Sequence, residues 1–199
     1  MNLIKENLFK KFISTIDYKP NNTLRPFVIV FIGLHGSGKS YISKKISNIL
    51  NIPVCSNDEI RRFLNKQGFK GEKSVQDILK YIAESGTEQL LKDKVSHIID
   101  ADIIAFQKEV QERVLKYGAK IYFIKIISSE EYILKRLKQR KKTKDSMSLT
   151  GIESYYDRKK IHEKFKVNKI DVIINNDPGN NLNIQLDKLI KILKQDNVI

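Results

Sequence analysis

Residues 33–40 limit the possible folds of this chain more than any other segment. They read Gly-Leu-His-Gly-Ser-Gly-Lys-Ser, which satisfies the pattern Gly-x-x-x-x-Gly-Lys-(Ser/Thr) of a phosphate-binding loop. Residues 27–32 before this octet are apolar and rich in β-formers, and residues 41–50 after it have helical periodicity. Because a phosphate-binding loop requires this strand–loop–helix context, the sequence predicts a P-loop NTPase fold of the α/β class.

The residue types of the octet suit the binding of a polyphosphate. Glycines permit positive φ values and close backbone approach, so successive N–H groups can point at phosphate oxygens. We expect Lys39 to reach the β- and γ-phosphate oxygens and the Ser40 hydroxyl to ligate Mg²⁺. The motif leaves the His35 position open, and we expect its side chain to point to solvent or to cap the loop. The residues expected to bind the nucleotide are Gly33, His35, Gly36, Ser37, Gly38, Lys39, Ser40 and Tyr41.

Apolar runs and helical periodicity alternate along the rest of the chain. Strands are expected at residues 27–32, 53–55, 97–99, 119–127 and 172–174. Helices are expected at residues 3–16, 41–50, 58–65, 74–95, 103–116, 128–140, 152–165 and 182–194. This alternation predicts a three-layer α/β/α fold with a five-stranded parallel sheet. We assign residues 1–25 to an N-terminal helical extension and residues 26–199 to the P-loop domain.

Local sequence patterns predict where one helix ends and where another begins. Gly118 stands at the C′ position of the helix at 103–116, where a left-handed residue often ends a helix. Ser128 and Glu131, three residues apart, match a capping box for the helix that runs to Arg140.

Asp58 and Arg61 come after the second strand, at the sheet edge where ligands of such folds bind. They are three residues apart and share a helix face. An aspartate here can accept or orient the proton of an attacking hydroxyl, while the arginine binds an anionic group of the acceptor. The competing interpretation makes Asp58 an ordinary helix N-cap. Spacing alone does not separate the two.

Asp100 ends an apolar strand, as a carboxylate that binds Mg²⁺ directly or through water does in P-loop NTPases. Asp102 could share that work or cap the following helix. Arg136 and Arg140 lie four residues apart at the entrance to residues 141–150, a polar and basic stretch. A basic segment there is expected to act as a lid that neutralises charge on the phosphates, although a solvated surface explains most of its lysines better.

The formal net charge is +14, with a single cysteine, Cys55, among 199 residues. A positive field attracts anionic partners such as nucleotides or nucleic acid, but a composition rich in Lys, Asn and Ile explains the charge equally well. One cysteine excludes an internal disulfide, and no apolar run is long enough to span a bilayer. Since the first residues also lack a secretion signal, we expect a cytoplasmic protein.

Residues 168–171 read Asn-Lys-Ile-Asp, the pattern with which GTPases recognise guanine. We reject this interpretation because the tetrapeptide precedes an apolar strand, whereas in those GTPases it ends one. The usual Asp-x-x-Gly switch is also missing, because residues 100–103 read Asp-Ala-Asp-Ile.

Three segments together resemble the small P-loop kinases related to phage polynucleotide 5′-hydroxyl kinase, a group that includes zeta-toxin-like and antibiotic phosphotransferases. These are residues 33–40, residues 56–61 (Ser-Asn-Asp-Glu-Ile-Arg) and residues 97–102 (His-Ile-Ile-Asp-Ala-Asp). With similar stretches at 155–158 and 172–176, the resemblance covers roughly residues 27–176. It implies a general base at Asp58, an acceptor-binding Arg61, and a lid arginine best matched by Arg140. The chain departs from many relatives at His35, where they have Pro, and at Asp102, where they have Asn.

The expected activity is that of an ATP- and Mg²⁺-dependent kinase, with GTP left open as a donor. Lys39, Asp58, Arg61 and Arg140 are its expected catalytic residues, and Ser40 and Asp100 its metal ligands. The expected acceptor is a hydroxyl group of a small molecule, because few aromatic residues for base stacking accompany the basic residues that cluster between Lys135 and Lys169. Two alternatives remain: a polynucleotide 5′-hydroxyl kinase, and a nucleotide-binding module without catalysis.

Overall fold

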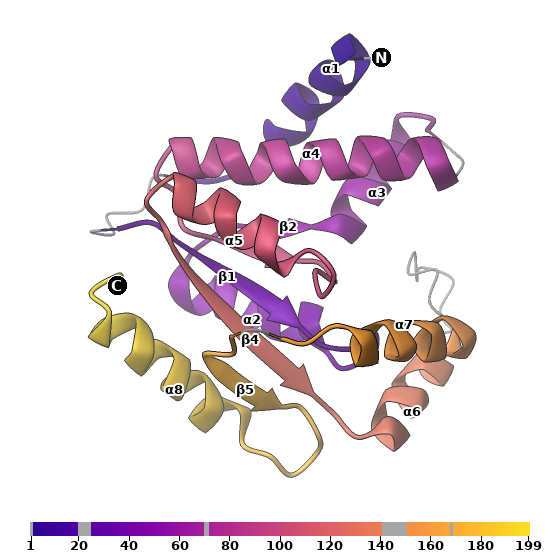
Figure 1. The fold of residues 1–199 in the computed structure, drawn as a ribbon, viewed down its shortest axis with the longest axis vertical. Helices are drawn as coiled ribbons and strands as arrows, with labels where there is room; N and C mark the ends of the chain where they lie inside the picture. The colour runs from indigo at the N-terminus through magenta and orange to yellow at the C-terminus, as the bar shows by residue number, and fades with distance from the viewer. Residues whose placement is uncertain (1, 20–24, 70–71, 141–150, 168) are drawn as a thin grey trace.

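A computed structural model of the chain describes residues 2–19, 25–69, 72–140, 151–167 and 169–199. Within these residues, five parallel strands form one sheet in the order β2-β3-β1-β4-β5 (Figure 1). The strands are β1 (Phe27–Ile32), β2 (Val54–Ser56), β3 (His97–Asp100), β4 (Lys120–Ile127) and β5 (Val172–Asn175). The predicted five-stranded parallel sheet is confirmed.

β1 lies at the centre of the sheet and is buried on both faces. It pairs with β3 on one side and with β4 on the other, with Val30 opposite both Ile99 and Phe123. Every residue of β1 is buried, which explains why the strand is an unbroken apolar run and does not alternate. The end of β1 therefore delivers residues 33–40 to the middle of the carboxyl edge of the sheet.

Helices cover both faces of the sheet, as the three-layer prediction requires (Figure 1). In chain order they are α1 (Asn2–Ile13), α2 (Lys39–Leu50), α3 (Asn57–Lys66), α4 (Glu72–Lys92), α5 (Gln107–Lys116), α6 (Glu130–Arg140), α7 (Ile152–Lys164) and α8 (Leu182–Gln195). Buried residues of α2 and α8, such as Ile42 and Leu189, pack with Phe31 and its neighbours on one face. Val114 of α5 and Leu91 of α4 pack with Val30 on the other.

The N-terminal helix α1 packs onto the helices of the expected acceptor side. Leu8 and Phe12 of α1 share a buried cluster with Leu64 of α3 and Ile82 of α4. This contact attaches α1 to the sheet indirectly, through α3 and α4. The division of the chain at residue 25 stays a prediction.

Two expected helix starts are wrong. Helix α5 begins at Gln107, not at residue 103, because a turn closed by the Phe106 N–H and the Ile103 carbonyl (2.7 Å) precedes it. That turn buries Ile103 in the core. Helix α6 begins at Glu130 without the predicted capping box, because the Ser128 hydroxyl donates to the Asp177 carboxylate. By contrast, Gly118, with φ of 68°, ends α5 as predicted.

The predicted lid at residues 141–150 lies outside the described residues. Among the helices of the described part of the chain, none has both the length and the hydropathy that a bilayer crossing requires.

Candidate nucleotide and acceptor site

The phosphate loop leaves β1 and enters α2 through glycines that the backbone requires. A Cβ atom on Gly33 would lie 2.5 Å from the carbonyl oxygen of Ile126 in β4, so no side chain fits there. Gly36 and Gly38 have φ values of 83° and 101°, which L-residues rarely adopt. Helix α2 begins directly after Gly38, so its N-terminus faces the loop and favours an anion there.

Two side chains from distant parts of the sequence hold the outer side of the loop. Arg136 of α6 donates from Nη1 to the carbonyl oxygens of Gly36 and Ser37, each at 3.3 Å. The Asn176 amide, just after β5, donates to the Ser37 carbonyl oxygen at 2.8 Å, and Arg136 also donates to the Asn176 carbonyl oxygen. These contacts fix the orientation of the Gly36 and Ser37 carbonyl groups, which point away from the inside of the loop.

The sequence did not predict that Arg136 and Asn176 contact the phosphate loop. Arg136 was expected only at the entrance to the lid, and Asn176 had no assigned role. Their contacts with the loop span 99 or more positions, so no spacing rule along the chain could have indicated them.

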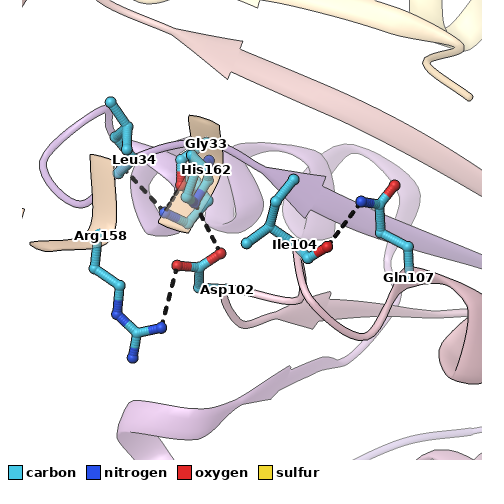
Figure 2. Close-up of polar contacts among 8 residues, drawn as sticks. Gly33, Leu34, Asp102, Ile104, Gln107, Arg158 and His162 are labelled. Atoms are coloured by element: carbon cyan, nitrogen blue, oxygen red, sulfur yellow. Dashed lines mark hydrogen bonds and ion pairs between the residues drawn. The ribbon is translucent and has the colours of Figure 1, made fainter. Parts of the chain in front are cut away.

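Lys39 and Ser40 occupy the first turn of α2. The Lys39 ammonium donates to the carbonyl oxygens of Gly33 (2.6 Å) and Leu34 (3.1 Å). These two carbonyls are drawn in Figure 2. The charge of Lys39 therefore lies against the loop, where it lowers the pKa values of Asp100, Asp102 and His35.

The Ser40 hydroxyl lies close enough to the Asp100 carboxylate, at the end of β3, to lower the pKa of that carboxyl group. Burial raises the pKa of Asp100 above its ordinary value, while the Ser40 hydroxyl and the charge of Lys39 oppose that shift. The pair joins the start of α2 to the neighbouring strand, where the sequence predicted the metal ligands.

This donor set fits Mg²⁺ bound together with a nucleotide. The described residues contain no group of three or more His, Cys, Asp or Glu side chains that could enclose a metal ion by themselves. Mg²⁺ commonly uses one or two protein oxygens and completes its octahedron with water and phosphate oxygens. In addition, the buried Ser37 Oγ has no hydrogen-bond partner among the described residues. A polar atom of this kind, inside a loop of peptide N–H groups, suits a phosphate oxygen.

Asp58 and Arg61 lie on the first turn of α3, directly after β2. Arg61 Nη1 is 3.0 Å from Asp58 Oδ1, and the Asp58 side chain is 41% exposed. The N-cap position of α3 is Ser56, so the interpretation of Asp58 as the N-cap is wrong. The negative charge of Asp58 acts on both Asp100 and His35, which indicates that it lies on the same side of the sheet edge as the phosphate loop.

His35 is partly buried in the loop and does not simply face solvent. Burial, together with the charges of Lys39 and Arg158, lowers its pKa to about 4 against the opposing effect of Asp102 and Asp58. The imidazole is therefore neutral at pH 7. The pKa of His35 thus depends on four charged side chains from four different segments of the chain.

Asp102 neither caps α5 nor resembles a solvated metal ligand. Its side chain is 7% exposed, and it contacts His162 (3.1 Å) and Arg158 (3.8 Å) of α7 (Figure 2). Burial alone would raise the pKa of Asp102, but the His162 hydrogen bond and the charge of Lys39 outweigh it and hold the pKa at about 2. The sequence suggested neither partner, because both lie more than fifty positions away.

Tyr41 and Arg140 stand apart from this cluster. Tyr41 is exposed at the start of α2, with the Lys45 ammonium 5.3 Å from the centre of its ring. Arg140 is the last residue of α6, and its side chain lies outside the described residues. The structure thus brings together the loop, Ser40, Asp100, Asp58 and Arg61, while the role of Arg140 stays a prediction.

Comparisons with known proteins agree with this architecture. An adenylate kinase of Thermosipho melanesiensis is 30% identical over 127 residues, which are 57% of this chain and 59% of that enzyme. The match therefore spans less than two thirds of the length of that relative.

Solved structures show the same fold at low sequence identity. A Chloroflexus aurantiacus protein proposed to be a kinase superposes with a TM-score of 0.66 at 12% identity, over 89% of this chain and 100% of that one. APS kinase of Mycobacterium tuberculosis, solved with AMPPNP and APS, gives 0.54 at 17% identity, over 85% and 98% of the two chains. The profile of the family described as AAA domain matches residues 28–157. The chain therefore belongs to this AAA domain family and has the fold of the small P-loop kinases.

Proposed function

We propose that the chain is an ATP- and Mg²⁺-dependent kinase that transfers the γ-phosphate to a hydroxyl group of a small molecule. The observation that carries this proposal is the place of Asp58. Its carboxylate leaves the first turn of α3 on the side of the phosphate loop, paired with Arg61 and partly exposed. A module that only binds nucleotides has no need of an accessible acid–base pair at this edge.

Each group has a separate task in the proposed reaction. The acceptor hydroxyl oxygen attacks the γ-phosphorus in line, the bond to the β–γ bridging oxygen breaks, and ADP leaves. Asp58 orients the hydroxyl and receives its proton, while Arg61 binds an anionic group of the acceptor. Lys39 neutralises charge on the β- and γ-phosphates.

The proposed metal site consists of two protein oxygens. The Ser40 hydroxyl and the Asp100 carboxylate would hold Mg²⁺, which would neutralise negative charge on the phosphates. The Ser40 hydroxyl affects the pKa of the Asp100 carboxyl group, which supports the proposal that the two oxygens lie near each other.

A small-molecule acceptor is supported by the fold relatives. The adenylate kinase and the APS kinase are both named for small phosphorylated molecules. A second candidate, a polynucleotide 5′-hydroxyl kinase, is favoured by the net charge of +14 and the pI of about 9.7. The two candidates differ in salt dependence, because a polynucleotide releases many counterions on binding and a small acceptor with one anionic group releases few.

The experiment is a transfer screen with γ-labelled ATP and Mg²⁺. The acceptors are a library of hydroxyl-bearing metabolites, 5′-hydroxyl DNA and 5′-hydroxyl RNA, with Lys39→Ala as the inactive control. The proposal predicts labelled product from a small acceptor, with a KM that changes little between low and high salt. Product from oligonucleotides alone, with a KM that rises steeply with salt, would select the second candidate. Nucleotide binding without any transfer would reduce the chain to a binding module.

A further inference from the structure

One turn of α7 is attached to the carboxyl end of β3 by a single buried carboxylate. Asp102 and His162 have side chains that are 7% and 14% exposed, and His162 Nε2 lies 3.1 Å from Asp102 Oδ1. Arg158, one helical turn before His162, lies 3.8 Å from Asp102 Oδ2 and is 44% exposed. A charged contact that is shielded from water is screened far less than an ion pair on the surface. Asp102 therefore restrains this part of α7.

A second acidic residue holds another side of the same helix. Glu130 accepts hydrogen bonds from the Tyr155 hydroxyl (3.2 Å), the Tyr156 hydroxyl (3.3 Å) and the Lys159 ammonium (2.6 Å). With contacts on two sides, α7 can neither roll about its axis nor slide without breaking one set of contacts. The position along α7 from which Arg158 projects is thereby restrained.

Arg158 lies close enough to the phosphate loop to act on it. Its positive charge contributes to the lowered pKa of His35 inside the loop, and Lys39 of the loop contributes to the lowered pKa of Asp102. Figure 2 shows the Asp102 carboxylate directed at His162 on one side and at Arg158 on the other. A guanidinium has five N–H donors, and the contact at 3.8 Å engages one nitrogen, so the group can still bind an anion.

We propose that Asp102 is a positioning residue: together with His162 it holds α7 so that Arg158 adds its charge to the binding of the terminal phosphate of a nucleoside triphosphate. This inference rests on the proposed function only in that the loop must bind a nucleoside triphosphate. It gives Asp102 a role different from metal binding: Oδ1 contacts His162 at 3.1 Å, whereas Oδ2 lies 3.8 Å from Arg158 and is buried without a hydrogen-bond partner among the described residues.

The test compares the affinities of Mg²⁺·AMPPNP and Mg²⁺·ADP by calorimetry. Arg158→Gln should weaken AMPPNP about tenfold and leave ADP nearly unchanged, since one charge-assisted hydrogen bond to the terminal phosphate is lost. Asp102→Ala should produce the same selective loss, because it releases Arg158. The double variant should be no weaker than either single variant. The matched control is Lys160→Gln, which removes a positive charge from an exposed position of α7 (74% exposed) and should change neither affinity.

Several results would overturn the inference. Additive losses in the double variant would mean that Asp102 and Arg158 act independently. Equal weakening of ADP and AMPPNP by Asp102→Ala would mean that the loop itself was disturbed. If Asp102→Ala fails to fold, Asp102→Asn replaces it, since it keeps the side-chain shape and an acceptor for His162 but removes the charge opposite Arg158. Unchanged AMPPNP selectivity in that variant would contradict the proposal.

The failure of the proposed function would look different. In that case the wild-type chain would bind AMPPNP more tightly than ADP, and the coupling between Asp102 and Arg158 would be measured as expected, but no acceptor in the screen would be phosphorylated. A wild-type chain that binds neither nucleotide would overturn the role of Arg158 directly. Hydrogen exchange in α7 adds a readout without nucleotide: Asp102→Ala should speed exchange in α7, and Lys160→Gln should not.

Discussion

The side-chain amide of Asn176 lies against Gly38 and donates to the carbonyl oxygen of Ser37 at 2.8 Å. A Cβ atom on Gly38 would stand 1.9 Å from the Asn176 Nδ2 atom. The segment after β5 therefore closes the outer side of the phosphate loop. Gly38 has two reasons to be glycine: its φ of 101° and this contact.

Gly38→Ala should greatly weaken nucleotide binding. The added methyl group must displace Asn176, which breaks its hydrogen bond to Ser37 and lets the Ser37 peptide rotate. We expect Mg²⁺·ATP affinity to fall at least about tenfold, the effect of losing one charge-assisted phosphate contact. Calorimetry with Mg²⁺·ATP measures the change.

A matched control, Gly68→Ala, separates the steric clash with Asn176 from the strain of a positive φ value. Gly68 also has a positive φ, 83°, but a Cβ there would meet nothing within 4 Å. Gly68→Ala should lower the free energy of unfolding by about 1–2 kcal/mol, the strain of a left-handed residue, and leave ATP affinity unchanged. Adding Asn176→Ala to Gly38→Ala should recover part of the lost affinity. No recovery would show that strain at Gly38 alone accounts for the loss.

Asp58→Asn should separate binding from transfer. If Asp58 receives the hydroxyl proton, the variant should lose about 10²–10⁴ in kcat with the acceptor found in the screen, the range typical of a lost general base. Affinity for Mg²⁺·ATP should hardly change, because the amide keeps the shape of the side chain and a contact with Arg61. Steady-state kinetics and calorimetry measure the two quantities. Asp157→Asn, at an exposed position of α7, is the control for the loss of one negative charge. Wild-type kcat in Asp58→Asn would rule out the general base.

The sequence predicts those parts of the site that depend on residues close together along the chain. The octet at 33–40 carries its own pattern, and Asp58 and Asp100 come after apolar strands whose ends must meet at one sheet edge. The strands themselves were predictable because a strand buried on both faces is a continuous apolar run. The order of strands in the sheet then brought these segments together.

The part that escaped prediction depends on pairs far apart in the chain. Ser128 matched a helix cap, but Asp177 from the loop after β5 offers it a carboxylate that a local pattern cannot reveal. Ile103 has helical spacing with Val110, yet burying Ile103 in the core favours a turn at this position. Asp102 contacts His162 and does not cap α5 for a similar reason, because tertiary contacts outweigh the weak local preference for a helix cap.

Stability should fall as the pH is lowered from about 6.5 to about 4. Burial lowers the pKa of His97 to about 4, and His35 is lowered similarly, whereas the unfolded chain has histidine pKa values near 6.5. Between these values the unfolded chain binds more protons than the folded chain, so the free energy of unfolding rises with pH. The slope should be about 1.4 kcal/mol per pH unit for each histidine that only the unfolded chain protonates.

Urea unfolding across this pH range tests the prediction. His97→Leu removes one of the two groups at a fully buried position, so the slope should decrease by about half whatever the absolute stability of the variant. A slope that is the same in His97→Leu and in the wild type would mean that His97 is protonated in the folded chain. The remaining slope should decrease again in His35→Asn.

Phe12→Ala tests whether α1 is an accessory extension or a part of the acceptor side. Phe12 is 5% exposed and meets Phe63 of α3 edge to face, with ring centres 5.4 Å apart. Removing a buried phenyl group costs about 3–5 kcal/mol in a core that cannot collapse around the cavity. Because α3 also carries Asp58 and Arg61, the loosened packing should raise the acceptor KM and leave Mg²⁺·ATP affinity unchanged.

Leu3→Ala, at a side chain of α1 that is 71% exposed, is the control and should change neither the stability nor the acceptor KM. If Phe12→Ala costs less than about 1 kcal/mol, α1 contributes little to the core, and residues 1–25 behave as an extension that the P-loop kinase domain does not need.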